Sequence, residues 1–369
     1  MVQKTIRLAK PEFRQTLYKS LQSLLEEGYL VQGKNVKSFE EALSECLNGT
    51  YAIAVSSGTA ALHLALLSLG IGAGDEVILP AYSFAATVNV VRVSGAIPIF
   101  VDIEERNFCI DVLKVESVIT DKTVAIMPVH EFGSMTKMTT MMEIANKYQL
   151  RVVEDAACAL GSEYKEKPAG TFGDIGCFSF HPRKIITTGE GGALVTTDPQ
   201  IAEDLRRLRS HGSLGGANNE NFILAGLNYR MTEIQALLGI DQLKELHHFI
   251  NIRKKQAALY NEGLKQLEWL ELPLPNDDFK HTYQSYQIVV KNGKRDRLRE
   301  FLRSKGVECN NGAQFLPELG YLKRDEVCYR KQFPNAWKAY SQGLVIPIGH
   351  HINEEDVAYV INAIKEFNG

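Results

Sequence analysis

GCFSFHPRKIITTGEGGALVTTD, residues 176–198, is the part of the sequence on which the fold assignment turns. Two short apolar runs, 176–180 and 191–197, enclose a loop of small, hydroxylated and glycine residues. Such runs predict two buried strands joined by an irregular connection. Lys184 lies in that connection, either as a surface lysine beside a turn or as an amine held still for chemistry.

Further apolar runs precede this stretch and alternate with helical patterns. The expected strands cover residues 51–57, 75–80, 97–102, 123–130 and 151–157. The expected helices cover residues 58–70 and 138–150. Short apolar strands separated by helices indicate a mostly parallel sheet covered by helices on both faces. The sequence therefore predicts a large α/β domain.

The pattern changes at about residue 232, where a long segment with apolar residues at helical spacing begins. Two strands and two helices after about residue 250 predict a smaller C-terminal α/β domain. We expect an N-terminal segment at 1–25, a large domain at 26–245 and a small domain at 246–369. A cleft between the domains would be a natural binding site.

Composition excludes several classes of partner. The 369 residues carry 41 basic and 44 acidic side chains, a formal net charge of -3, which gives no reason to expect nucleic acid or an anionic membrane. The N-terminus lacks an apolar signal core, and no run approaches the length of a membrane helix. A cytoplasmic protein is expected.

The cysteines and histidines do not form a metal-binding pattern. The six cysteines contain no CxxC pair, which in a chain of this length indicates reduced thiols. Two adjacent histidine pairs, at 247–248 and 350–351, would point in different directions on a helix. No metal site is therefore predicted.

Polar residues follow the ends of several expected strands, where ligands of parallel sheets bind. Ser57, Gly58 and Thr59 lie where a strand ends and a helix begins, so their N–H groups and the helix dipole would attract an anion. Taken alone, the same residues fit a helix N-cap with a glycine turn better. The absence of a Walker lysine pattern and of GxGxxG disfavours a nucleoside triphosphate or a dinucleotide.

Asp155 and Lys184 add two further chemical functions. Asp155 ends an apolar strand, so its carboxylate is either a cap for the next helix or the partner of a buried cation. Lys184 could form an imine with an aldehyde. An anion site, a carboxylate for a ring nitrogen and an imine-forming lysine are what pyridoxal 5'-phosphate requires. Ser179 could donate to the phosphate, and Phe84 could stack on the ring or belong to the core.

Blocks along almost the whole chain carry a family resemblance. They read IRLAKPEF, GYLVQGKNVKSFEEAL, VSSGTAALHLALLSLGIGAGDEVILP, VEDAACALGSEYK, GDIGCFSFHPRKIITTGEGGALVT and GLNYRMTEIQALLGIDQL. In this order they make the chain resemble the sugar aminotransferases of the DegT/DnrJ/EryC1/StrS family. This family is a branch of the fold-type I pyridoxal-phosphate enzymes.

The resemblance implies roles for individual residues. Lys184 matches the lysine that binds the cofactor covalently, and Asp155 matches the carboxylate facing the pyridine nitrogen. Ser179 and the Gly58–Thr59 turn match phosphate ligands, and Phe84 matches the stacking aromatic. The resemblance also implies a homodimer with shared active sites, in which Asn228 reaches the phosphate of the neighbouring subunit.

Some positions depart from the usual family pattern. Cys158 stands where a glutamine commonly contacts the ring hydroxyl, and a thiol is a weak hydrogen-bond donor. Glu131 and Phe132 stand where Leu and Tyr are common. Relatives that dehydrate their substrate have histidine in place of the lysine, so the intact Lys184 disfavours dehydration.

The expected reaction follows from the family. It moves an amino group from glutamate, or glutamine, to a nucleotide-linked keto-deoxysugar. Amination of a cyclitol ketone of the inosose type is an alternative, and a non-catalytic cofactor-binding regulator is a remote one. Candidates for contact with the substrate are His181, Tyr283, Asn310, Gln314 and Phe315.

Overall fold

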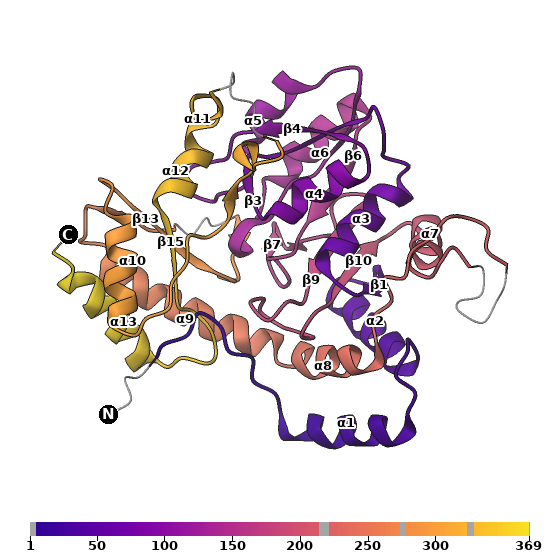
Figure 1. Ribbon diagram of the computed structural model, residues 1–369, viewed down its shortest axis with the longest axis horizontal. Coiled ribbons are helices and arrows are strands. Elements are labelled where there is room, and N and C mark those ends of the chain that lie inside the picture. The colour runs from indigo at the N-terminus through magenta and orange to yellow at the C-terminus, as the bar shows by residue number, and fades with distance from the viewer. Residues whose placement is uncertain (1–4, 214–220, 274–277, 323–327, 369) are drawn as a thin grey trace.

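The computed structural model describes residues 5–213, 221–273, 278–322 and 328–368. Its main element is a seven-stranded sheet with the order β1-β10-β9-β6-β5-β2-β4 (Figure 1). The strands are β1 (Tyr51–Val55), β2 (Glu76–Pro80), β4 (Ile97–Val101), β5 (Thr123–Ile126), β6 (Arg151–Asp155), β9 (Ile175–Ser179) and β10 (Gly192–Thr196). β10 is antiparallel to both neighbours, and the pairs from β9 to β4 are parallel. The predicted mostly parallel sheet is confirmed.

Helices cover both faces of this sheet because alternate side chains of each strand enter different cores. In β1, Ile53 and Val55 join one apolar cluster, whereas Ala52 and Ala54 join the other. The first cluster is covered by α3 (Gly58–Ser68), α4 (Ala85–Val93) and α7 (Pro199–Arg209). The second is covered by α2 (Lys34–Cys46), α6 (Met138–Tyr148) and α8 (Glu233–Leu243).

A second, antiparallel sheet lies in the C-terminal part. It consists of β11 (Leu270–Glu271), β13 (Tyr286–Val290) and β15 (Gly343–Ile346). It shares an apolar core with α9 (Leu246–Leu264), α10 (Arg295–Ser304) and α13 (Glu354–Glu366). Because this core is separate from those of the large sheet, we propose to retain the division at residues 245 and 246.

The N-terminal segment contacts both parts of the molecule. α1 (Gln15–Glu27) packs against α8 and ends at Gly28, which has the left-handed φ of 72° that favours glycine (Figure 1). Further upstream, Ile6 forms a parallel bridge to Val307 and is buried in the C-terminal core. The sequence patterns predicted neither this bridge nor α1.

Short elements connect the two parts. β14 (Gln314–Phe315) pairs with β3 (Tyr82–Ser83), which brings a C-terminal loop to the edge of the large sheet. The remaining strands are β7 (Glu163–Tyr164), β8 (Lys167–Pro168) and β12 (Phe279–Lys280). The remaining helices are α5 (Val112–Val115), α11 (Tyr329–Gln332), α12 (Pro334–Gln342) and the 3₁₀ turns η1 (Glu116–Val118), η2 (Glu131–Gly133) and η4 (Leu316–Glu318).

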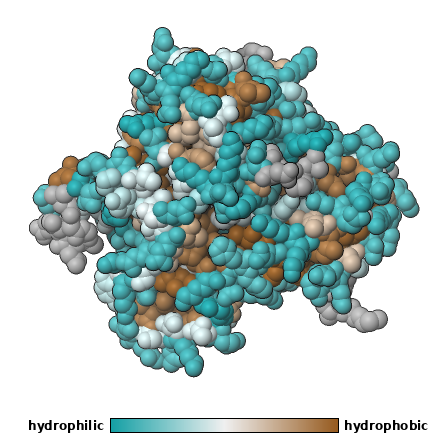
Figure 2. Space-filling model, turned by 180° about the vertical axis from the view of Figure 1, so that it is seen from behind, coloured by the Kyte–Doolittle hydropathy of each residue, from teal (hydrophilic) through white to brown (hydrophobic). Residues whose placement is uncertain are grey.

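The surface is mostly hydrophilic. Seen from behind, hydrophobic residues reach it in separate patches between polar regions (Figure 2). Within the four described ranges, none of the helices combines the length and the apolar character needed to cross a membrane.

Candidate active site

The carboxyl ends of the parallel strands open into a pocket of about 520 Å³, within the size range of small-molecule sites. It is also lined by residues just before β13, by the loop between α10 and β14, and by residues of β15. Nine of the predicted site residues line it: Gly58, Thr59, Phe84, Asp155, Cys158, Ser179, His181, Lys184 and Asn310.

The N-terminus of α3 forms one wall of the pocket. The Ser57 hydroxyl accepts a hydrogen bond from the Ala60 N–H at 3.0 Å, so Ser57 is the N-cap. The N–H groups of Gly58 and Thr59 lie in the first helical turn and have no carbonyl partner one turn earlier. Ser179 faces this turn so closely that a Cβ on Gly58 would lie 2.7 Å from the Ser179 Cβ. The wall has the geometry of an anion cradle.

Gly58→Ala is expected to weaken binding of pyridoxal phosphate by at least about tenfold, because the added methyl displaces Ser179 from the cradle. Equilibrium titration of the cofactor-free protein measures this affinity. Gly320→Ala is the matched control, since a Cβ there meets nothing within 4 Å. Equal affinities for the two variants would contradict the cradle.

Asp155 closes the inner end of the pocket. Its Oδ2 accepts from the Thr87 hydroxyl at 2.8 Å, and its Oδ1 accepts from the Ala157 N–H at 3.2 Å. Burial raises the pKa of Asp155 above its usual value, because it outweighs the lowering effects of these hydrogen bonds and of the nearby Lys184. A buried carboxylate of this kind is suited to pair with a protonated ring nitrogen.

Glu154 fixes β6 from the opposite face of the strand. Its fully buried carboxylate accepts a hydrogen bond from the His130 ring at 2.8 Å. It also accepts the backbone N–H groups of Gly170, Phe172 and Gly173 at 2.9, 2.6 and 2.8 Å. Four donors therefore hold the residue next to Asp155, and His130 points away from the pocket.

Glu154→Gln is expected to lower the free energy of unfolding by about 3 kcal/mol, because one amide cannot satisfy the four donors of a carboxylate. Chemical denaturation of the cofactor-free protein measures this change. Glu203→Gln on the surface of α7 is the control. A loss below about 0.5 kcal/mol would show that the buried carboxylate does not hold the strand.

Lys184 lines the same pocket as the anion cradle. Its Nζ donates a hydrogen bond to the Cys158 Sγ at 2.9 Å. Burial lowers the pKa of Lys184, but Cys158 and the carboxyl groups of Glu131 and Asp155 outweigh this effect and raise it. Burial also raises the pKa of the Cys158 thiol. The amine is therefore protonated at neutral pH and must lose a proton before it can attack an aldehyde.

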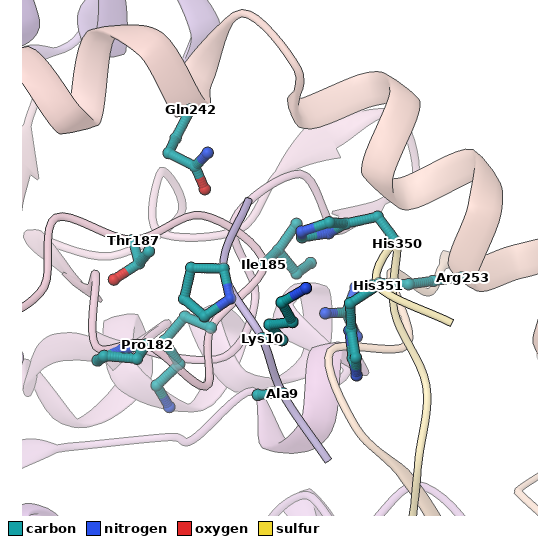
Figure 3. A pocket seen from close by; sticks show the side chains of 11 residues that line it. Ala9, Lys10, Pro182, Ile185, Thr187, Gln242, Arg253, His350 and His351 are labelled. Carbon is teal, nitrogen blue, oxygen red and sulfur yellow. The ribbon is translucent and has the colours of Figure 1, made fainter. Parts of the chain in front are cut away.

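The loop that carries Lys184 lies close to other parts of the chain. The Gln284 side-chain amide donates to the Arg183 carbonyl at 2.7 Å, which links the loop to the C-terminal part. Behind the loop, a void of about 10 Å³ separates it from the N-terminal segment at Ala9 and Lys10 and from His350 (Figure 3). Three distant parts of the sequence therefore meet around the lysine loop.

The other predicted residues lie outside the pocket wall. Asn228 is exposed and is not among the pocket-lining residues of its own chain. Tyr283 is buried and stacks on His281, and Phe315 packs against Trp337. The Gln314 side chain accepts the Ala85 N–H at 3.0 Å. In this structure, contacts within the protein explain the positions of the Tyr283, Phe315 and Gln314 side chains.

The sequence patterns did not single out Ser83 and Thr87, which lie in the wall behind Asp155. Their spacing of four residues across a strand-to-helix junction is a signal that could have placed both hydroxyls on one side. Glu131 was noted only as a departure from the family pattern, although it is buried and lines the pocket.

The assembled groups fit pyridoxal phosphate. The Gly58 turn with Ser179 would hold the phosphate, Asp155 would face the ring nitrogen, and Lys184 would bind the aldehyde carbon. Phe84 is 64% exposed although Tyr82 and Ser83 just before it are buried, so its ring is free to cover a flat ligand.

Comparisons with known proteins agree with this arrangement. A model of the DegT/DnrJ/EryC1/StrS aminotransferase family matches residues 11–365. An uncharacterised protein of Methanocaldococcus jannaschii is 38% identical over 93% of this chain and 92% of its own. GDP-perosamine synthase of Caulobacter vibrioides is 35% identical over 90% of each chain.

A solved structure extends the match to three dimensions. Spr1654 of Streptococcus pneumoniae, a sugar aminotransferase by its description, was solved in its PLP form. It is similar with a TM-score of 0.91 and 26% identity, over 98% of both chains. The chain therefore belongs to the DegT/DnrJ/EryC1/StrS aminotransferase family and is a pyridoxal-phosphate-dependent enzyme of fold-type I.

Proposed function

We propose that this enzyme moves an amino group from glutamate, or glutamine, to a keto-deoxysugar linked to a nucleotide. The observation that carries the proposal is that Lys184, Asp155 and the anion cradle all line one pocket. Its volume of about 520 Å³ leaves room for a second molecule beside a cofactor. The Caulobacter relative, named for a GDP-linked amino sugar, supports a nucleotide sugar as acceptor.

Different residues of the site would have different roles in this reaction. When bound, pyridoxal phosphate supplies an electron sink that stabilises negative charge on the substrate carbon. Asp155 would keep a proton on the ring nitrogen by pairing with it. Lys184 would hold the cofactor and would also serve as the base that removes a proton from the donor's α-carbon. The same two residues would play these roles for the acceptor.

The outer part of the pocket would receive the sugar. Asn310 lines this part, and its side-chain oxygen accepts the Gly312 N–H at 2.9 Å, which leaves its amide nitrogen for a ligand. Arg183 and His181 line the same pocket and offer donors to a diphosphate. We propose these three residues as substrate contacts.

The test uses the enzyme loaded with pyridoxal phosphate. Glutamate is expected to convert the bound cofactor to its amino form, which a change in its absorbance reports. GDP-, dTDP- and UDP-linked keto-deoxysugars, added separately to the amino form, should then restore the original spectrum in at least one case. Recovery only with a keto-inositol would instead support the cyclitol reaction. No conversion by either glutamate or glutamine would overturn the proposal.

We also propose that the enzyme acts as a homodimer in the cytoplasm. Exposed apolar side chains gather in the sequence between α1 and α2, at Tyr29, Leu30 and Val31, and Asn228 is exposed outside its own pocket. An exposed apolar surface, and an asparagine that would contact the phosphate of the neighbouring subunit, are both typical of a shared interface. All six cysteines are free thiols, which suits a reducing compartment. Light scattering should therefore give twice the 41.2 kDa chain mass.

A further inference from the structure

One wall of the active-site pocket is apolar. Four residues that form it, Leu8, Phe132, Ala313 and Val345, all line the pocket. Phe132, Ala313 and Val345 belong to a single apolar cluster, and Leu8 packs against that cluster. Because the four residues come from distant parts of the sequence, this wall exists only in the folded chain. We call it the apolar wall.

Hydrogen bonds fix Leu8 at the pocket. The Ile6 N–H donates to the Gly306 carbonyl, and the Glu308 N–H donates to the Ile6 carbonyl, both at 2.9 Å. The Leu8 N–H then donates to the Glu308 Oε2 at 3.0 Å. Side chains two residues apart in an extended segment lie on the same side, and Ile6 enters the C-terminal core. Leu8 therefore faces inward too, where it reaches the pocket.

Two further members of the apolar wall lie beside Asn310. Val345 and Asn310 form an antiparallel bridge, with N–H to carbonyl distances of 2.8 and 3.2 Å in the two directions. Ala313 lies farther along the same loop, and its N–H donates to the Tyr82 hydroxyl at 3.1 Å. The apolar wall therefore adjoins a polar side chain that we propose as a contact of the sugar.

Phe132 is held in the wall in spite of its backbone conformation. Its φ of 55° is left-handed, which bulky side chains rarely adopt. Its ring packs edge to face against Tyr82 and Phe108, with ring centroids 6.3 and 5.7 Å apart. Strained residues of this kind persist only where surrounding contacts impose them, and they cluster at binding sites. The Phe132 ring is therefore a fixed part of the apolar wall.

The chemistry of the proposed reactants indicates what this wall contacts. Glutamate and glutamine carry polar or charged groups at both ends, and the nucleotide carries phosphates. A deoxysugar differs from these molecules because it can present a methyl group next to its hydroxyls. An apolar surface favours burial of a methyl group, whereas a hydroxyl buried there loses its hydrogen bonds to water.

We infer that the apolar wall binds the terminal methyl group of the acceptor, and so selects a deoxysugar against the same sugar with a terminal hydroxymethyl group. This inference rests on the proposed function and adds the feature of the sugar that the pocket distinguishes. Leu8 and Val345 are specificity-determining residues in this account. Leu8 precedes the part of the chain that the family model matches, so the family assignment does not cover it.

Ligand binding to the enzyme loaded with pyridoxal phosphate tests this inference. Calorimetry compares GDP-D-rhamnose with GDP-D-mannose, and the 6-deoxy forms of dTDP-glucose and UDP-glucose with their parent compounds. The members of each pair differ only at the terminal carbon, and none has a ketone, so binding is measured without turnover. In the pair with the preferred nucleotide, the deoxy form should bind at least about tenfold more tightly.

Two substitutions place a polar group in the apolar wall with little change of shape. Leu8→Asn and Val345→Thr should each reduce the preference for the deoxy form to within about threefold. Each substitution tests the wall independently, so Val345→Thr decides the question even where Leu8→Asn prevents folding. Leu113→Asn on α5 is the control, because Leu113 is 82% exposed, and it should keep the wild-type preference.

The outcomes separate this inference from the proposed function. Equal affinities within every pair that binds, a reversed preference, or an unchanged preference in the folded wall variants would overturn the inference while transamination persists. If no nucleotide sugar binds and no keto-sugar restores the spectrum of the loaded enzyme, the proposed function fails and this inference fails with it.

Discussion

Replacing Lys184 by alanine is expected to lower kcat/KM for transamination by at least about 10⁴-fold. The variant loses both the amine that binds the cofactor and the base that moves the proton, and proton transfer alone contributes up to about 10⁴-fold. The measurement is kcat/KM with glutamate and the best keto-sugar nucleotide found in the screen. The variant should also lack the absorbance of covalently bound cofactor.

Lys37→Ala is the matched control for this prediction. Lys37 lies on α2, its side chain is 78% exposed, and it forms a surface ion pair with Glu41. Its loss should change neither activity nor stability measurably. Substantial transamination by Lys184→Ala, beyond a few per cent of the wild-type rate, would mean that another group carries the proton.

Replacing Asp155 by asparagine is expected to lower kcat/KM by about 10³-fold, because an uncharged amide cannot hold a proton on the ring nitrogen. Stability should move in the opposite direction or stay constant. The amide keeps the size of the carboxyl and its bond to Thr87, and it removes the cost of a buried charge. Thermal unfolding of the cofactor-free protein and steady-state kinetics together measure both effects.

Asp204→Asn serves as control, since Asp204 lies on α7 beside Arg207. A parallel loss of activity and stability in Asp155→Asn would indicate a purely structural role. A loss of activity alone identifies the charge as the functional property.

The large sheet could be predicted from the sequence because its strands are buried on both faces. In β2, Val77 and Leu79 enter one core and Ile78 enters the other, so residues 77–80 read as an unbroken apolar run. β15 has four residues, too few for a periodic signal, and only two strands were expected in the C-terminal part. Contacts over long sequence distances, such as β3 with β14, leave no local pattern.

The site could be predicted for those residues that lie at the end of a strand. Asp155 and Ser179 end β6 and β9, and the order of parallel strands places such residues at one edge. Strand order alone could not place Asn310 in the same pocket, because it comes from the C-terminal part, and it was a candidate only through the family resemblance. The link from Thr87 to Asp155 escaped prediction for another reason. It depends on side-chain directions that spacing does not specify.

The bridge from Ile6 to Val307 affects how the chain can fold during its synthesis. The ribosome makes Ile6 about three hundred residues before its bridge partner Val307, and before most of the surrounding core. The segment before α1 must therefore wait, unpaired, until that core has been synthesised. A bulky insertion beside Ile6 would obstruct this late docking step.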